Sequence, residues 1–403
     1  MQAEIEIKQS RPASSLAESL FLSLAARIEV GALSLTLPDG RAYDFEGPHA
    51  GPRADLQIRR ERVYRRILLG GTLAFAEAYM AGECDSEDPA ALVECVIANE
   101  TALLAALNRH RWMRVMERIG HRLRPNSKRG ARRNIARHYD LGNDFYALWL
   151  DSSMTYSAAL FERPGESLEA AQGNKYRRMA ERAGIGPGDH VLEVGCGWAG
   201  FCRWAAREIG CRLTAVTISR AQYDFAAQRL QAEGLSERVE LRLQDYRDIA
   251  GQFDRIVSIE MLEAVGERYW PRYFDMLRQR LLPGGRAALQ VITIDDPLFA
   301  TYRNGVDFIQ RYIFPGGLLP SPGRLREEVG RAGLAWCGAE GYGADYARTL
   351  ALWRRAFEAA WPQIQALGFD ERFRRMWRYY LAYCEAGFKT GRIDVLQAAI
   401  AKG

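Results

Sequence analysis

The ten residues 191–200, Val-Leu-Glu-Val-Gly-Cys-Gly-Trp-Ala-Gly, constrain the fold of this chain more than any other stretch. An apolar strand runs into a glycine-rich turn, and a helix is expected to start at Phe201. Such a turn lets backbone N–H groups come close to a polar ligand. The spacing of Gly195, Gly197 and Gly200 also fits the G-x-G-x-x-G pattern of dinucleotide sites. The stretch alone therefore leaves two classes of ligand open.

The strands that follow separate these two classes. A dinucleotide site requires an acid about 20 residues further on to hold the ribose hydroxyls. The second strand, 212–216, runs into Thr-Ile-Ser with no acid, whereas Glu193 lies inside the first strand. This arrangement suits S-adenosylmethionine, which has an amino acid tail and no pyrophosphate. After the third strand, 239–243, Asp245 can accept from the adenine amine and Tyr246 can lie on the ring. We therefore predict a methyltransferase, rather than a dinucleotide enzyme or a turn without a ligand.

The order of the expected elements indicates the fold class. Strands and helices alternate from residue 190 to 293, which predicts a doubly wound parallel sheet. An aromatic-rich insertion near 295–330 interrupts the alternation, and helices at about 346–365 and 370–387 precede the last strand. We expect an α/β, Rossmann-like class I methyltransferase fold with a seven-stranded, mostly parallel sheet. Its strands are predicted at 190–194, 212–216, 239–243, 254–259, 286–293, 334–340 and 393–400.

The first part of the chain predicts a smaller α+β domain over residues 1–107. The pattern indicates an amphipathic helix at 15–27, a β-hairpin at 28–45 around Pro-Asp-Gly, and a loop rich in Gly and Pro at 47–52. Helical patterns follow at 61–69, 72–80 and 88–107. We expect a lipid-engaging domain at 1–107, a basic linker at 108–133 and a methyltransferase domain at 134–403.

A basic segment lies at this domain boundary. Residues 109–137 carry eleven Lys and Arg side chains against one acid, Glu117, with apolar residues interleaved. Such a segment can bind an anionic lipid surface, where each basic residue contributes about 1 kcal/mol. Contact with nucleic acid and a solvated linker face are the alternatives, but the chain has no nucleic-acid-binding motif. We expect contact with an anionic membrane surface and no nucleic acid partner.

Other features indicate the location of the chain. No apolar run approaches the roughly 18–20 residues that span a bilayer, and the N-terminus lacks a basic region followed by an apolar one. The seven cysteines have no C-x-x-C spacing and indicate neither a disulfide framework nor a zinc site. We expect a cytoplasmic protein without a bound metal, peripheral at the inner membrane surface.

Seven motifs, taken together and in order, resemble the cyclopropane fatty acid synthase family. The similarity covers about 130–400, and residues 70–90 resemble the N-terminal lipid-handling domain of the longer members, which also suggests a homodimer. The motifs are His-Tyr-Asp-Leu-Gly-Asn at 138–143, Met-Thr-Tyr-Ser at 154–157, Gly-Cys-Gly-Trp at 195–198, Thr-Ile-Ser-Arg-Ala-Gln at 217–222, Tyr-Ile-Phe-Pro-Gly-Gly at 312–317, Gly-Ala-Asp-Tyr at 343–346 and Tyr-Tyr-Leu-Ala-Tyr-Cys at 379–384.

The resemblance implies methyl transfer from S-adenosylmethionine to the cis double bond of a phospholipid acyl chain. Attack by the alkene leaves a carbocation, and loss of a methyl proton closes a cyclopropane. This chemistry requires an aligned alkene, exclusion of water and a proton acceptor. Residues 260–266 with Gln290 resemble a sub-branch that includes methyl-branching enzymes, so a methylene or methyl branch is the alternative product. A lipid-binding homologue without activity is a second alternative.

Carried over by position, the resemblance and the strand pattern give two sets of ligand-contacting residues. Aromatic rings in an acyl channel would offer π faces to a cation, although each of these rings could also be ordinary core. The predicted channel residues are Phe145, Trp149, Phe308, Tyr312 and Phe314. The predicted cofactor-binding residues are Tyr156, Ser157, Glu193, Gly195, Gly197, Thr217, Ser219, Gln222, Gln244, Asp245 and Tyr246.

The proton acceptor is where this chain departs from the family. The resemblance implies a bicarbonate ion held by Cys, Glu, His and Tyr side chains. Glu263 and Tyr346 match that pattern, whereas Ala158 stands at the Cys position and Gln290 at the His position. An amide can still donate to an anion, so bicarbonate stays open beside Glu263 as the base, with Tyr346 orienting it. His138 and Cys384 match two further family positions. The sequence places no base beside Cys384 and so favours a buried structural thiol there, while His138 either positions the neighbouring loop or satisfies a helix end.

Overall fold

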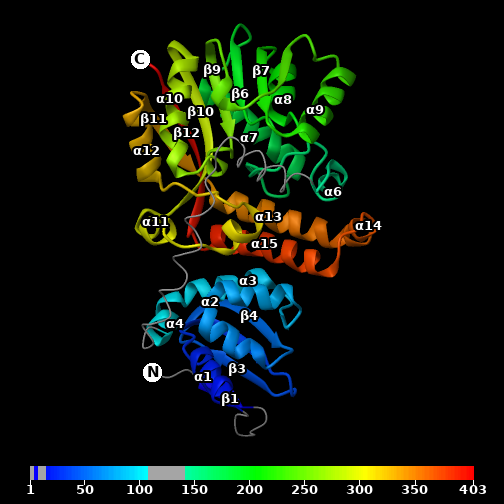
Figure 1. Ribbon diagram of the computed structural model, residues 1–403, viewed down its shortest axis with the longest axis vertical. Coiled ribbons are helices and arrows are strands. Elements are labelled where there is room, and N and C mark those ends of the chain that lie inside the picture. The colour runs from blue at the N-terminus through cyan, green and yellow to red at the C-terminus, as the bar shows by residue number, and fades with distance from the viewer. Residues whose placement is uncertain (1–3, 8–14, 108–140) are drawn as a thin grey trace. The chain divides into compact units, whose positions relative to one another are not determined.

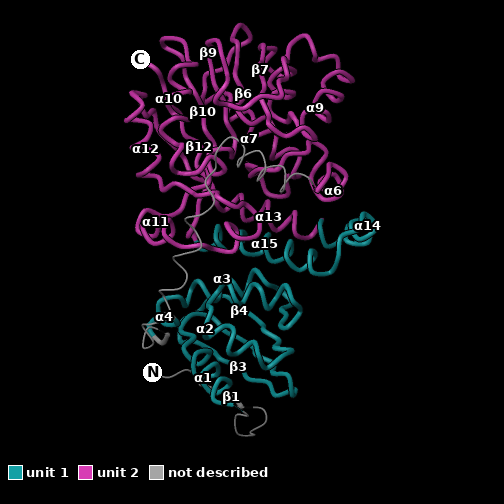
Figure 2. The backbone as a smooth tube through the Cα atoms, viewed as in Figure 1, with its two compact units in different colours: residues 1–120, 357–390 teal, residues 121–356, 391–403 magenta. Residues whose placement is uncertain are grey.

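The computed structural model describes residues 4–7, 15–107 and 141–403. They form two compact units, drawn in teal and magenta in Figure 2. Unit 1 holds residues up to 120 together with 357–390, and unit 2 holds 121–356 with 391–403. The basic segment 109–137, the expected linker 108–133 and His138 lie outside the described residues. Among the described residues, no helix is both long and apolar enough to cross a bilayer.

A seven-stranded sheet forms the centre of unit 2, as the alternating pattern predicts (Figure 1). Its strand order is β11-β12-β10-β9-β6-β7-β8. The strands from β6 to β10 pair in parallel, whereas β12 runs antiparallel to both β10 and β11. The strands are β6 His190–Val194, β7 Arg212–Thr217, β8 Val239–Leu243, β9 Phe253–Ile259, β10 Leu281–Ile294, β11 Ala335–Gly341 and β12 Ile393–Ala401.

Helices cover both faces of this sheet. Successive side chains of a strand point to opposite faces, so Val191 packs in one core cluster and Leu192 in the other. The first cluster includes Met179 of α7 (Leu168–Ala183) and Phe201 of α8 (Gly200–Glu208). The second includes side chains of α10 (Trp270–Arg280) and α12 (Pro322–Arg331). Burial on both faces explains why these strands are nearly continuous apolar runs. The remaining helices of unit 2 are α6 Asn143–Ala147, α9 Arg220–Ala232, α11 Asp296–Tyr302 and α13 Gly343–Ala359.

Unit 1 contains a five-stranded sheet in the order β1-β3-β2-β4-β5. The predicted helix and hairpin are confirmed, but the loop expected at 47–52 is wrong, because β4 begins at His49 and pairs in parallel with β2. Strands β2 and β4 approach each other closely here, since a Cβ on Gly31 of β2 would lie 2.1 Å from Pro52 O of β4. The strands are β1 Glu4–Ile7, β2 Val30–Thr36, β3 Ala42–Glu46, β4 His49–Ile58 and β5 Cys84–Asp85.

Helices complete unit 1. The break predicted between 61–69 and 72–80 is present as a kink in α2 at Gly71, whose φ is +57°. The helices are α1 Leu16–Ala25, α2 Arg62–Met80, α3 Pro89–Ala98, α4 Glu100–Leu107, α14 Trp361–Ala366 and α15 Glu371–Lys389.

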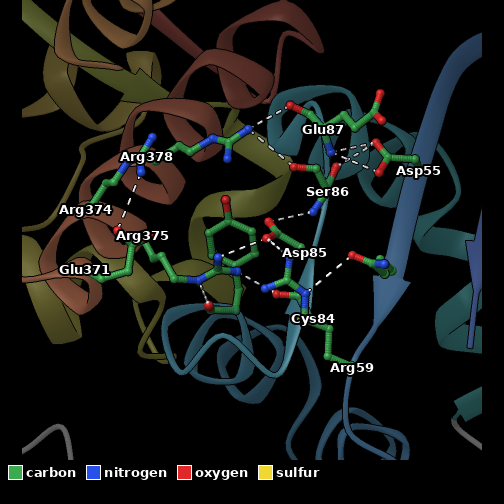
Figure 3. Close-up of polar contacts among 12 residues, drawn as sticks. Asp55, Arg59, Cys84, Asp85, Ser86, Glu87, Glu371, Arg374, Arg375 and Arg378 are labelled. Carbon is green, nitrogen blue, oxygen red and sulfur yellow. Dashed lines mark hydrogen bonds and ion pairs between the residues drawn. The ribbon is translucent and has the colours of Figure 1, made fainter. Parts of the chain in front are cut away.

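The helix α15 packs on α2 and α3, although the sequence pattern places it with the methyltransferase domain. Figure 3 shows the buried guanidinium of Arg375, which joins α15 to the end of α2 and to β5. Its Nε donates to Tyr79 O at 2.5 Å and its Nη2 to Cys84 O at 2.6 Å, while Nη1 lies 3.0 Å from Asp85 Oδ2. Arg378 adds a hydrogen bond to Glu87 O at 2.8 Å. These contacts between distant segments explain why 357–390 belongs to unit 1.

Candidate active site

The glycine turn between β6 and α8 is fixed to the neighbouring strand. The amides of Gly195 and Cys196 both donate to Val216 O at 3.0 Å. Gly195 has a φ of +85°, and a Cβ there would lie 2.8 Å from Met261 Cγ. Gly197 has a φ of +53°, but a Cβ there would meet no described atom within 4 Å. The turn is therefore closed on the β9 side and open at Gly197.

Glu193 on β6 is 3% exposed. Within the described residues its Oε2 has no hydrogen-bond partner. Burial raises the pKa of this carboxyl to about 8. A buried oxygen without a partner is costly to the fold, and a donor from a ligand would satisfy it.

At the end of β7, the predicted cofactor residues bond to one another. Thr217 Oγ1 donates to Gln222 Oε1 at 2.9 Å. Ser219 is the N-cap of α9, and its Oγ accepts from the amide of Gln222. These hydrogen bonds fix the geometry of the strand-to-helix turn.

At the end of β8, a buried ion pair forms. Both carboxylate oxygens of Asp245 accept from the Arg247 guanidinium, at 2.8 and 2.7 Å. Gln244 Nε2 donates to Asp248 O at 2.6 Å. The ring of Tyr246 is partly exposed and lies 5.4 Å from the Arg247 guanidinium. The predicted adenine site thus lies at the same edge of the sheet as the glycine turn, because β6, β7 and β8 are parallel neighbours.

Three aromatic rings surround Tyr156, and one of them is the predicted channel residue Trp149. Its ring lies 5.4 Å from Tyr146, 5.7 Å from Trp149 and 5.3 Å from Trp353. Phe145 contacts Trp149 at 5.8 Å, and both are almost fully buried. Tyr156 itself is only partly buried. Phe145 and Trp149 therefore support the ring that is predicted to face the cofactor.

The other predicted channel residues lie in the insertion after β10. Phe308 immediately precedes a π-helical turn, Ile309–Ile313, and contacts Tyr312 at 5.5 Å. Phe314 ends that turn and is partly exposed, whereas Phe308 is buried. π-helical turns occur frequently at functional sites.

Lys175 on α7 is fully buried. Its Nζ donates to Ser157 Oγ at 2.7 Å. Burial lowers the pKa of Lys175 to about 7, and the carboxylates of Glu260, Asp151 and Glu193 oppose that shift. Ser157, a predicted cofactor residue, is therefore held by a buried amine.

Glu260, at the carboxyl end of β9, is the residue that the sequence interpretation missed. Its Oε1 accepts from Ala158 N at 2.8 Å and from Gln290 Nε2 at 2.7 Å, and its Oε2 accepts from Tyr346 Oη at 2.6 Å. The expectation that Tyr346 orients Glu263 is therefore wrong, because its hydroxyl proton is directed to Glu260. An acid at the end of a central parallel strand was the available signal, as it was for Asp245.

Glu263 lies one short turn after Glu260. Its Oε1 accepts from Ile292 N at 2.5 Å, and within the described residues its Oε2 has no hydrogen-bond partner. Burial, and then the negative charge of Glu260, raise the pKa of Glu263 to about 8. Leu318 N donates to the backbone oxygen of Glu263, which ties this turn to the insertion.

The family profile described as mycolic acid cyclopropane synthetase matches residues 126–398. The chain belongs to this cyclopropane synthase family. It is accordingly an S-adenosylmethionine-dependent methyltransferase that modifies lipid acyl chains. The predicted family, the predicted fold class and the predicted enzyme class are thereby confirmed.

The relatives of this chain within the family are named for different products. The tuberculostearic acid methyltransferase of Mycobacterium tuberculosis is 43% identical, over 91% of this chain and 86% of that protein. The cyclopropane-fatty-acyl-phospholipid synthase of Escherichia coli is 35% identical, over 87% of this chain and 88% of that protein. A crystal structure of a mycolic acid cyclopropane synthase in complex with SAH and CTAB is 30% identical, with a TM-score of 0.64 over 70% of this chain and 100% of that chain.

S-adenosylmethionine is the cofactor, and the geometry fits it. The unsatisfied oxygen of Glu193 can accept from the amino group of the amino acid tail. The open side of Gly197 leaves room beside the turn. The individual cofactor contacts stay predictions for all of these residues, and Asp245 already binds Arg247 through both oxygens.

The described part of unit 2 does not include two of the predicted catalytic residues. His138 is outside the described residues. Cys384 lies on α15, in unit 1, and is partly buried. Within unit 2, the structure brings Gln290 and Tyr346 together on Glu260, and Glu263 follows in the next turn.

Proposed function

We propose that this chain transfers a methyl group from S-adenosylmethionine to the cis double bond of an unsaturated phospholipid acyl chain and closes a cyclopropane. One observation carries the proposal. The segment that holds the predicted cofactor residues Tyr156 and Ser157 continues into Ala158, whose amide binds the Glu260 carboxylate at 2.8 Å. The predicted cofactor residues and a carboxylate that could accept a proton are therefore adjacent, as methyl transfer followed by proton loss requires.

S-adenosylmethionine supplies an electrophilic methyl group on a positively charged sulfur. The alkene π electrons form the new C–C bond, while the C–S bond pair stays on sulfur. The resulting cation loses a proton from the transferred carbon, and the freed C–H pair closes the ring. Rings such as Tyr156, partly buried beside Trp353, can stabilise the cation and exclude water.

The lipid substrate is supported by the names of the relatives and by the charge of the chain. The Escherichia coli relative, 35% identical, is named for fatty acyl groups on phospholipid. We propose that the basic residues within 109–137 bind the anionic headgroups of a membrane surface. Peripheral attachment to the inner membrane surface and a homodimer are further parts of this proposal.

A second product is favoured by a specific observation. The 43% identical relative is named a tuberculostearic acid methyltransferase, and one from Pseudomonas putida, 36% identical, is named a probable fatty acid methyltransferase. A hydride shift toward the cation before proton loss would give a methylene branch in place of a ring. The same site can support both outcomes.

Product analysis tests the proposal. The purified protein is incubated with S-adenosylmethionine labelled in the methyl group and liposomes of unsaturated phospholipid, and the recovered acyl chains are examined by NMR. Upfield cyclopropane protons are expected. Exocyclic methylene protons would overturn ring closure and establish the branched product. Absence of label from the acyl chains would overturn the assignment of this substrate class.

A further inference from the structure

The Glu260 carboxylate is bound by donors from three separate elements of unit 2. Ala158 N comes from the loop after α6, Gln290 Nε2 from β10 and Tyr346 Oη from α13, all within 2.8 Å of a carboxylate oxygen. Three donors on one anion form an anion-binding site. Here the anion belongs to the chain itself.

The backbone at Glu260 supports a functional interpretation of this arrangement. Its φ is +49°, a left-handed conformation that few residues other than glycine adopt. Strained positions of this kind persist where the surroundings fix them, often at active sites. The amide of Glu260 still donates to Gln290 O at 2.8 Å, so the turn begins directly at the end of the β9–β10 pairing.

A second amide fixes the donor on β10. Gln290 and Gln397 are paired across β10 and β12, and Gln397 Nε2 donates to Gln290 Oε1 at 3.1 Å. Because its oxygen is occupied, the amino group of Gln290 faces Glu260. Both glutamines are 1% exposed. Burying two amides is costly without such pairing, which indicates that the orientation of Gln290 matters.

The titratable groups around Glu260 differ in their hydrogen-bond partners. Burial raises the pKa of the Glu260 carboxyl, and its three donors oppose that shift. Glu263 has one donor, and Lys175 is held by Ser157. A carboxylate with a raised pKa is a better proton acceptor. Glu260 as a whole residue is partly exposed, but its carboxyl group is buried among these donors.

We infer that the Glu260 carboxylate accepts the proton lost from the transferred carbon, and that the anion site of Ala158, Gln290 and Tyr346 is filled by Glu260 in place of a free anion such as bicarbonate. This inference rests on the proposed function. The proton passes from the transferred carbon to a Glu260 oxygen, and the C–H electron pair forms the ring bond or, after a hydride shift, the double bond of a methylene. Because the same carbon loses the proton in both cases, the role of Glu260 is independent of the product. Release of that proton to solvent restores the Glu260 carboxylate.

The variant Glu260→Gly tests this role, because glycine accepts the φ of +49° and leaves the three donors without an anion. Turnover is measured in buffer depleted of carbon dioxide, then with added bicarbonate or formate. We expect wild-type turnover to be independent of either anion. Glu260→Gly should lose about 100-fold and regain at least a tenth of the wild-type rate with an added anion. The variant Glu237→Gln, which changes an exposed carboxyl before β8, should behave as wild type.

A binding measurement provides a second readout. Carbon-13 NMR of labelled bicarbonate should show line broadening with Glu260→Gly and none with wild-type protein. Wild-type turnover that falls when carbon dioxide is removed would overturn the inference, as would a Glu260→Gly variant with near-normal turnover in depleted buffer. If wild-type protein modifies no unsaturated phospholipid, the proposed function fails, while the NMR comparison still decides whether Glu260 fills the anion site. Equal melting temperatures for the two proteins establish that the variant is folded.

Discussion

The side-chain amide of Gln397 donates to the amide oxygen of Gln290 at 3.1 Å, across the antiparallel pair of β12 and β10. The variant Gln397→Leu removes this donor, so the Gln290 amide can turn away from Glu260. We expect kcat to fall about 10-fold, the effect of roughly one hydrogen bond, with little change in KM. Since a donor lowers the pKa of the carboxyl it binds, its loss should move the acid limb of the pH–rate profile to higher pH. An unmoved acid limb would limit Gln397 to a structural role.

Glu263 should tolerate conversion to its amide. Burial and the charge of Glu260 raise the pKa of Glu263 to about 8, so at pH 7 the carboxyl is protonated and the amide resembles it. We expect Glu263→Gln to retain kcat/KM within about 10-fold at pH 7, well above the residual rate of Glu260→Gly. Above pH 8 the wild type should change rate while the variant does not. A loss at pH 7 as large as that of Glu260→Gly would instead make Glu263 the base.

Glu193 should make stability depend on pH. Its folded-state pKa is raised to about 8 against an ordinary value of 4.5, so between these values the unfolded chain has released a proton that the folded protein retains. Stability contributed by the neutral carboxyl is therefore complete below about pH 4.5 and lost as pH rises toward 8, by at most about 1.4 kcal/mol per pH unit. Urea unfolding of wild type and Glu193→Gln at pH 5, 6.5 and 8 checks this. Parallel losses in the two proteins would contradict it.

Arg375 should be essential for unit 1. The variant Arg375→Met leaves Tyr79 O, Cys84 O and the Asp85 carboxylate without their buried partner. Breaking such a pair costs about 3–5 kcal/mol, and thermal or urea unfolding measures it. Arg372→Met, an exposed change on the same helix, should stay within about 0.5 kcal/mol of wild type. Similar losses in both variants would show that the effect comes from removing a positive charge from α15.

The basic segment should make membrane attachment sensitive to salt. Exposed charges are screened as ionic strength rises, so binding to anionic liposomes in a sedimentation assay should weaken between 50 mM and 500 mM salt, roughly a threefold shorter Debye length. Replacing Arg132 and Arg133 by Gln should weaken binding at low salt. Neutral liposomes are the control. Binding that does not respond to salt would indicate an apolar anchor.

Local patterns predicted the elements well, because each depends on neighbouring residues. All seven strands of unit 2 occur at or near the positions that the pattern predicts, although β8 and β11 are not apolar runs. The kink at Gly71 was likewise visible as a gap between two helical patterns. β4 was missed because Gly51 and Pro52, which indicate a loop locally, lie in close contact with Gly31 of β2.

The resemblance grouped Ala158, Gln290 and Tyr346 as positions of one anion site, but the place of Glu260 in that site was not predictable from the sequence. Ala158, Gln290 and Tyr346 are far apart in the sequence, and their convergence on Glu260 depends on how the strands and α13 pack. The bicarbonate pattern directed attention to Glu263, which matches one of its positions, whereas Glu260 entered only as part of the segment 260–266 that resembles the sub-branch, with no role assigned to it. The same limit applies to α15, whose place in unit 1 depends on Arg375 reaching backbone oxygens almost 300 residues earlier in the chain.

The left-handed backbone of Glu260 also has a genetic consequence. Each glutamate codon differs from a glycine codon by one base, and glycine is the residue that adopts this backbone without strain. One nucleotide change therefore separates a protein that carries its own proton acceptor from one whose rate would follow the supply of dissolved carbon dioxide. A substitution at position 260 alone could therefore make such an enzyme depend on dissolved carbon dioxide, with no rearrangement of the surrounding fold.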